Sequence, residues 1–147
     1  MFYIIVLLGV TVHYTHSIFL STMVDFAMDR GMSLDAASSL VAYSSVADFV
    51  GSLLLPLFAD RGFVRRSTLV MWCYASLATC MMCFSIVPSA AHFVLSVLVE
   101  MLVSTIITMK AVMMADYLGA ERIPIAFASM GLVLIPLFLC NPLIVGE

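Results

Sequence analysis

Acidic and basic side chains interrupt the long apolar runs of this sequence at a few positions where charge is costly. Asp48 lies within VADFVGSLLLPLF, and Glu100 and Lys110 share a later run. On insertion scales, a charged residue at the centre of a membrane helix costs about 2.5–3.5 kcal/mol, so it faces protein or a water-filled cavity. Acids in such positions typically bind protons, ions or solutes. These three residues are therefore the first candidates for a functional site.

Asp48 belongs to a polar stripe on its predicted helix. At about 100° per residue, three serines of the same run fall within about 40° of one another, and Asp48 lies within about a further 40°. The serines are Ser38, Ser45 and Ser52. Ala47 and Gly51 form a small-xxx-small pair, which lets a neighbouring helix approach closely. The stripe favours an Asp48 that faces a cavity and functions there; the alternative is a protonated Asp48 that hydrogen-bonds between helices for structure alone.

His13 and His16 are three residues apart in the first apolar run and have polar neighbours. A His-x-x-His pair can supply two ligands to a metal or a haem, but no further ligands with suitable spacing follow. We therefore expect no metal site and no cofactor, and we expect His16 to line a cavity or to hydrogen-bond between helices. The alternative is a redox subunit that uses both histidines.

Lys110 has two interpretations. Its ammonium group either accompanies Asp48 as a cation or extends to the cytoplasmic interface. At a rise of about 1.5 Å per residue, Lys110 lies about 9 Å from the inner surface, which leaves a gap of about 9 Å to the depth of Asp48. Glu100 lies about 15 Å above Lys110 on the same helix, so the two cannot pair directly. We expect Glu100 near the outer end of the cavity.

Composition places these residues in a membrane protein. Of the 147 residues, 64% are hydrophobic and 10% are charged, whereas soluble domains average about 45–50% apolar residues. A soluble domain of this length could not bury so much apolar surface, so the solvent is lipid and a soluble enzyme is excluded. No basic patch with interleaved aromatic residues indicates a nucleic-acid partner. The four cysteines lie within apolar runs, which argues against a disulfide framework.

Five segments are long enough to cross a hydrocarbon core, which takes about 20 helical residues. Because backbone polar groups in lipid must be satisfied within their own segment, all five are predicted to be helices. They cover about residues 2–23, 34–58, 67–87, 92–115 and 124–145. A turn at Pro88, Ser89 and His92 is predicted between the third and the fourth, and Pro124 suits the first turn of the fifth. The sequence thus predicts an all-α membrane protein.

The basic residues set the predicted orientation. The connections at 59–66 and 116–123 contain four arginines, and the opposite side contains one. The four are Arg61, Arg65, Arg66 and Arg122, and the fifth is Arg30. This asymmetry places the two arginine-rich connections in the cytoplasm and residues 25–37 outside. The odd number of spans indicates either a small five-span protein or, as we prefer, a part of a larger one.

The connection LFADRGFVRR resembles the short cytoplasmic loop between the second and third helices of each half of major facilitator superfamily transporters. In that superfamily the loop is associated with gating, which implies such a role for Asp60, Arg61, Arg65 and Arg66. The segments DFAMDRGMSLDAASSL, SSVADFVGS and MADYLGAERIPIAFASMGLVLIPLFLCNPLIVG, in this order, are similar to the monocarboxylate-transporter family. The resemblance covers essentially the whole chain. It implies helices seven to eleven of a twelve-helix transporter, which is a partial C-terminal six-helix half without the N-terminal half.

The resemblance also implies a function. Members of this family carry out secondary active transport of small organic solutes, such as monocarboxylates, together with a proton and by alternating access. For this chain it implies a multi-pass protein of the plasma membrane that is not an enzyme, with Asp48 as the group that binds the proton. Its solute- and proton-binding residues would be Asp48, Ser52, Glu100, Lys110 and His16.

One position departs from the family pattern. Monocarboxylate transporters typically carry an arginine four residues after the acid that corresponds to Asp48, and this chain has Ser52 there. A serine hydroxyl cannot replace a bidentate guanidinium as the partner of a carboxylate. The solute is then either neutral or zwitterionic, or it is an anion held by Lys110 or by the N-terminal half. Outside the transporter hypothesis, the chain is a non-transporting integral membrane protein or an inactive fragment.

Overall fold

The computed structural model describes residues 2–29, 31–84, 86 and 89–141, and the described chain is almost entirely helical. Its five long helices are α1 (Phe2–Asp29), α2 (Leu34–Asp60), α3 (Arg66–Phe84), α4 (Ser89–Leu118) and α5 (Ile123–Leu139). A short 3-10 helix, η1 (Ala120–Arg122), precedes α5. All five are long and apolar enough to cross a membrane, α5 together with η1. The chain therefore has the helices of an integral, multi-pass membrane protein, as the sequence predicts.

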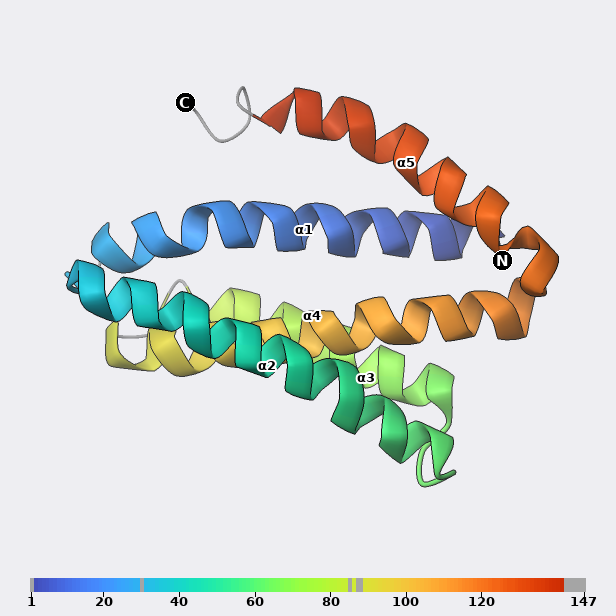
Figure 1. The fold of residues 1–147 in the computed structure, drawn as a ribbon, viewed down its shortest axis with the longest axis horizontal. Coiled ribbons are helices and arrows are strands. Elements are labelled where there is room, and N and C mark those ends of the chain that lie inside the picture. The colour runs from blue at the N-terminus through green and yellow to red at the C-terminus, as the bar shows by residue number, and fades with distance from the viewer. Residues whose placement is uncertain (1, 30, 85, 87–88, 142–147) are drawn as a thin grey trace.

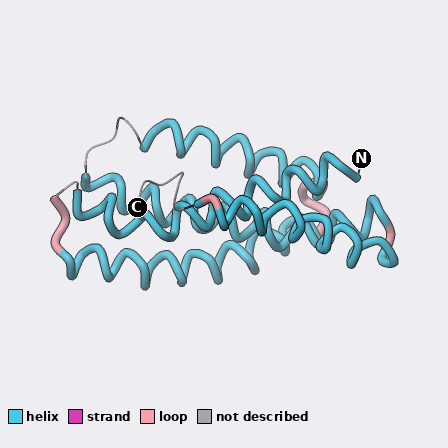
Figure 2. Tube along the Cα trace, turned by 90° about the horizontal axis from the view of Figure 1, so that it is seen from above, coloured by secondary structure: helices cyan, strands magenta, loops and turns pink. Residues whose placement is uncertain are grey.

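The helices run side by side along one long axis (Figure 1; Figure 2). In Figure 1, α5 lies along one side of α1, and α2, α3 and α4 lie along the other side. The connections α2–α3 and α4–α5 lie at the same end of the bundle as the start of α1. We call this end the arginine end, because it carries the four arginines that the sequence places on one side of the membrane.

Helix α4 forms the centre of the bundle and packs against each of the other four long helices. Val99, Val103 and Ile106 of α4 are at most 1% exposed and cluster with Val12 of α1 and Leu77 of α3. The other helices expose large apolar side chains, which suits surfaces in contact with lipid. Examples are Tyr3, Phe49, Trp72 and Leu132.

The predicted close approach at the small-xxx-small pair is confirmed, and the neighbour is α4. A Cβ atom on Gly51 would lie only 2.9 Å from the Cα of Met101, so the two backbones touch here. Two hydroxyls of α4 then donate to carbonyl oxygens of α2: Ser104 to Asp48 at 2.6 Å and Thr105 to Gly51 at 2.9 Å. Interhelical hydrogen bonds of this kind fix one helix against another in lipid.

The first helix continues six residues past the predicted end at residue 23, because nothing in its sequence stops it before Gly31. Gly31 has a φ of 80°, a conformation that favours glycine. The backbone N–H of Gly31 donates to Met28, and that of Met32 donates to Ala27, which closes the helix with a Schellman motif. Helix α2 then begins after Ser33, whose hydroxyl accepts from the Ala36 N–H.

The other boundaries also differ from the prediction. Helix α4 begins at Ser89, so His92 lies inside a helix and its predicted place in a turn is wrong; Pro88 lies outside the described residues.

The connection predicted at 116–123 is largely helical, because α4 continues to Leu118 and η1 follows Gly119. The connection predicted at 59–66 is shorter, since α2 ends at Asp60 and α3 begins at Arg66. Helix α3 ends at Phe84 and α5 at Leu139, and residues 85, 87–88 and 142–147 lie outside the described part. Pro124 lies in the first turn of α5 as predicted.

Candidate functional site

A cavity of about 170 Å³ lies between α1, α2 and α4, and we call it the acidic cavity because two carboxyl groups line it. Its polar wall consists of His16 from α1, Ser44, Ser45 and Asp48 from α2, and Glu100 from α4. The predicted site residues Asp48, Glu100 and His16 therefore meet in one place, although they lie far apart in the sequence. The apolar side chains of Leu20, Met23 and Val41 complete the lining.

Glu100 is the most buried ionisable group of this cavity. Its side chain is 3% exposed, and its Oε2 lies 3.0 Å from Nε2 of His16. An isolated buried carboxylate is unfavourable, and the imidazole compensates for it when it carries a proton. The second oxygen, Oε1, is buried without a hydrogen-bond partner in the described part of the chain. Glu100 thus has one oxygen in an ion pair with α1 and one that can accept from a further donor.

Asp48 differs from Glu100 in exposure. It lines the same cavity, close enough to His16 for an electrostatic interaction, but its side chain lies on the exposed side of α2. Of the predicted polar stripe, Ser45 also lines the cavity, whereas Ser38 and Ser52 do not. The cavity therefore holds two carboxyl groups that differ in burial around a single imidazole. Such a set binds protons, or the ammonium group of a solute, more readily than it binds an anion.

Lys110 does not reach the acidic cavity. Its side chain is buried, its Nζ contacts Nε2 of His13, and it lies 5.3 Å from the centre of the Phe127 ring. A charged ammonium group has only donors, so His13 accepts at Nε2 in that state. The alternative in which Lys110 extends to the cytoplasmic interface is not what the structure shows. The basic residue nearest to Asp48 in the cavity wall is His16.

The two histidines of the first helix have different partners, His13 with Lys110 and His16 with Glu100. Within the described ranges, no group of three or more His, Cys, Asp or Glu side chains could hold a metal ion.

Ser52 stands at the position where monocarboxylate transporters typically carry an arginine. It does not line the acidic cavity. Its hydroxyl donates to the carbonyl oxygen of Phe49 in its own helix, at 2.9 Å. Among the described residues, no arginine or lysine lines the acidic cavity. The described chain thus supplies no fixed cation at the position of the family's arginine.

The arginine end carries a second charged group, formed by residues of the predicted gating loop. Arg66 bridges two acids, donating to Asp60 at 3.0 Å and to Asp116 at 2.9 Å. Arg65 lines the shallow groove beside this bridge, and Arg61 lies against a separate groove. The bridge ties the end of α2 and the start of α3 to the end of α4.

Helix α4 buries a polar stripe of which sequence reasoning singled out only Glu100 as a site residue. His92, Ser96, Glu100 and Ser104 follow one another at intervals of four and are each at most 4% exposed. Residues four apart share one face of a helix, so this spacing was visible in the sequence as a buried polar stripe. No such spacing in the sequence marks Thr105, whose hydroxyl donates to the carbonyl oxygen of Gly51 in α2.

Comparison with known proteins gives no match: no protein-family model, no curated protein and no solved structure matches this chain.

Proposed function

We propose that this chain forms most of the C-terminal half of a secondary active transporter similar to the monocarboxylate transporters, and that it moves a small organic solute together with a proton. The observation that carries this proposal is the acidic cavity. It brings Asp48, Glu100 and His16 together from three apolar, membrane-length helices. Carboxyl groups inside membrane segments are costly and typically belong to a path for protons or solutes.

The three groups have separate roles in the proposal. His16 and Glu100 form a pair that joins α1 to α4 and forms one wall of the site. Asp48 binds the transported proton, because its carboxyl group lines the cavity and is more accessible than that of Glu100. Its backbone is held by the Ser104 hydroxyl, which fixes the position of this carboxyl group relative to α4.

The cavity favours a neutral or zwitterionic solute over a monocarboxylate anion. An anion in a low-dielectric cavity needs a cationic partner, and in the described residues the wall offers only the imidazole of His16, which already faces Glu100. The ammonium group of a zwitterion can pair with Asp48, and Oε1 of Glu100 can accept a further hydrogen bond. Any carboxylate of the solute would then need a cation from the N-terminal half that the resemblance implies.

The exposed polar face of α2 supports such a second half. Ser38, Ser45 and Asp48 lie on the outside of the five-helix body. Polar side chains on a membrane helix are unfavourable against lipid, so this face suits contact with further protein or with a water-filled path. In an alternating-access transporter, the two halves rock around a site near the middle of the membrane. In this proposal the transporter lies in the plasma membrane, and the Arg66 bridge belongs to its cytoplasmic gate.

Solute uptake measured with and without an inward proton gradient tests the proposal. The solutes are radiolabelled alanine and lactate, offered to cells that express the full-length transporter to which we propose this chain belongs. We expect alanine uptake to increase with the gradient and to exceed lactate uptake. Asp48→Asn should abolish the increase without changing the amount of protein at the surface. The matched control is Asp35→Asn, the same change in the exposed first turn of α2, which should transport like the wild type. Gradient-dependent uptake that survives Asp48→Asn contradicts the role of Asp48.

A further inference from the structure

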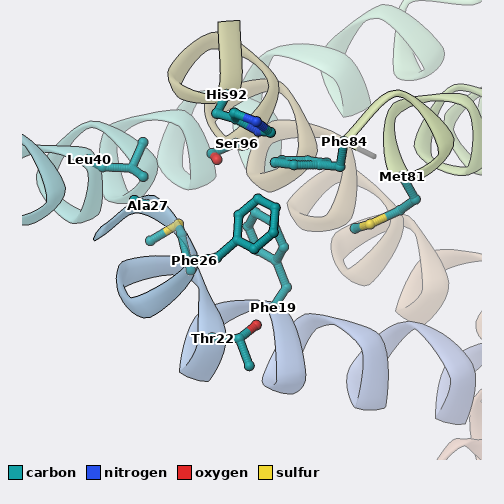
Figure 3. Close-up of a pocket in the computed structure, with 10 residues that line it drawn as sticks. Phe19, Thr22, Phe26, Ala27, Leu40, Met81, Phe84, His92 and Ser96 are labelled. Atoms are coloured by element: carbon teal, nitrogen blue, oxygen red, sulfur yellow. The ribbon is translucent and has the colours of Figure 1, made fainter. Parts of the chain in front are cut away.

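A second cavity, which we call the aromatic cavity, lies between α1, α2, α3 and α4 (Figure 3). Its lining residues come from the ends of these helices that lie opposite the arginine end. Its volume is about 170 Å³, and its wall is almost entirely apolar. Three phenylalanine rings and two methionine sulfurs surround it: Phe19, Phe26, Phe84, Met23 and Met81. Met23 also lines the acidic cavity, so the two cavities adjoin at this residue. None of the residues with a proposed role in transport lines the aromatic cavity.

The imidazole of His92, in the wall of this cavity, lacks a hydrogen-bond partner among the described residues. His92 is 2% exposed, and neither of its ring nitrogens has a hydrogen-bond partner in the described part of the chain. The ring stacks on Phe84, with centroids 5.5 Å apart, and meets Phe26 edge to face at 5.3 Å. These contacts hold the imidazole in place without satisfying its polar atoms. A buried polar group left unsatisfied is unfavourable, so a bound group that supplies a hydrogen bond would be stabilised here.

The polar atoms of the cavity gather at one side. Ser96 lies one turn after His92 on the same face of α4, and Figure 3 shows its hydroxyl on the side of the cavity near the imidazole. The hydroxyl of Thr22, also in the wall, donates to the carbonyl oxygen of Ile18 at 2.8 Å. The cavity thus offers an aromatic and thioether environment over most of its surface and one polar corner at His92 and Ser96.

We propose that the aromatic cavity is a binding site for a small, neutral aromatic alcohol of about the size of phenol. An apolar cavity of about 150 Å³ accommodates a benzene ring, so the size fits a single substituted ring. Phenylalanine rings and methionine sulfurs make favourable edge and face contacts with a bound aromatic ring. Both ring nitrogens of His92 are buried, so in the proposal the imidazole turns to bring one of them to the cavity surface, where it accepts a hydrogen bond from the ligand hydroxyl. Among the described residues, no Asp, Glu, Lys or Arg lines the cavity, so a charged ligand would remain unpaired.

Fluorine NMR of the full chain in lipid nanodiscs tests this site with 4-fluorophenol as the probe and fluorobenzene as the probe without a hydroxyl. Empty nanodiscs provide the signal of probe dissolved in lipid. We expect a saturable change of the 4-fluorophenol signal that unlabelled phenol reverses. Ala27→Phe fills the cavity from α1 and should abolish saturable binding of both probes. Ala27→Leu, a smaller filler, keeps the test valid if the first variant does not fold, as judged by circular dichroism.

The His92→Leu variant separates the polar corner from the apolar wall. It should weaken 4-fluorophenol binding about fivefold to tenfold, which corresponds to one lost hydrogen bond, and leave fluorobenzene within about twofold. Thr11→Leu, on an exposed face of α1 away from both cavities, is the control and should bind both probes like the wild type. Absence of saturable binding, for example because lipid chains fill the cavity, would overturn the proposal. So would binding that survives the filling variants, or equal weakening of both probes by His92→Leu.

Discussion

Replacing His16 tests whether its pair with Glu100 fastens α1 to α4. The Glu100 side chain is 3% exposed, and within the described chain only its Oε2 has a partner, at 3.0 Å. His16→Leu therefore leaves both carboxyl oxygens unpaired in the bundle. Removing one member of a buried pair typically destabilises a protein by about 3–5 kcal/mol. For a chain of this size, each kcal/mol lowers the thermal midpoint by about 2–4 °C, so we expect a loss of about 6–20 °C.

The double variant His16→Leu with Glu100→Leu decides between loss of the pair and a general packing defect. Replacing both members of a buried pair by apolar residues is often neutral or stabilising, so the double variant should recover most of the lost stability. The control is Thr11→Leu, because its hydroxyl donates to the carbonyl oxygen of Leu7 in its own helix. A surface change of this kind should alter the free energy of unfolding by no more than about 0.5 kcal/mol.

Thiol reactivity provides the assay. Cys73 and Cys80 are 3% and 7% exposed, so a fluorogenic maleimide reaches them only when the bundle opens. Cys140 is exposed and reacts in the folded state, so all variants carry Cys140→Ser to lower the background. Circular dichroism during the same heating ramp gives an independent midpoint. Glu100→Leu alone completes the comparison. If the double variant loses as much stability as His16→Leu and Glu100→Leu together, then His16 and Glu100 are not coupled and our description of the site is wrong.

Two further predictions concern helix packing and the arginine end. Gly51→Ala pushes a methyl group into the Met101 backbone and should lower the free energy of unfolding by about 1–3 kcal/mol. The control is Gly131→Ala, whose methyl group meets no atom within 4 Å. It should leave the free energy of unfolding unchanged or raise it by up to about 1 kcal/mol. Equal shifts of the thermal midpoint would contradict the close contact between α2 and α4. Arg66→Ala removes an exposed bridge, so the midpoint should hardly change, but trypsin should cut the α2–α3 connection faster. High salt should also speed cleavage of the wild-type connection, because salt screens the bridge. The control variant Arg122→Ala should be cleaved there at the wild-type rate. An unchanged cleavage rate in Arg66→Ala would show that the bridge does not restrain the connection.

Helix type and number followed from the sequence, whereas helix ends did not. Five apolar runs of membrane length predict five helices, because lipid leaves the backbone no other partner. The end of α1 depends on local geometry instead: Asp25 and Asp29 remain helical, and the chain turns only at Gly31, where a positive φ is available. The sequence predicts a turn at Pro88, Ser89 and His92, but His92 lies within α4 as part of a buried polar stripe.

The sequence predicted which residues belong to the candidate site, but it did not predict which of them contact each other. Charge inside an apolar run singles out Asp48, Glu100 and Lys110 without any structure, because each is costly in lipid. Depth along a helix, which the sequence also gives, argues against a contact between Asp48 and Lys110. Which histidine meets which charge depends on how α1 is rotated against α4, and the sequence of one helix carries no information on that angle.

The sequence by itself determined that the chain forms five helices long and apolar enough to cross a membrane, which connections carry the arginines, and which residues are too polar for their surroundings. These properties follow from the free energy of placing individual residues in lipid. Only the tertiary structure decided that His16 pairs with Glu100, that Lys110 turns to His13, and that His92 meets no hydrogen-bond partner among the described residues around the aromatic cavity. Those outcomes depend on the distances and rotations between helices, which are set where small residues such as Gly51 let two backbones touch.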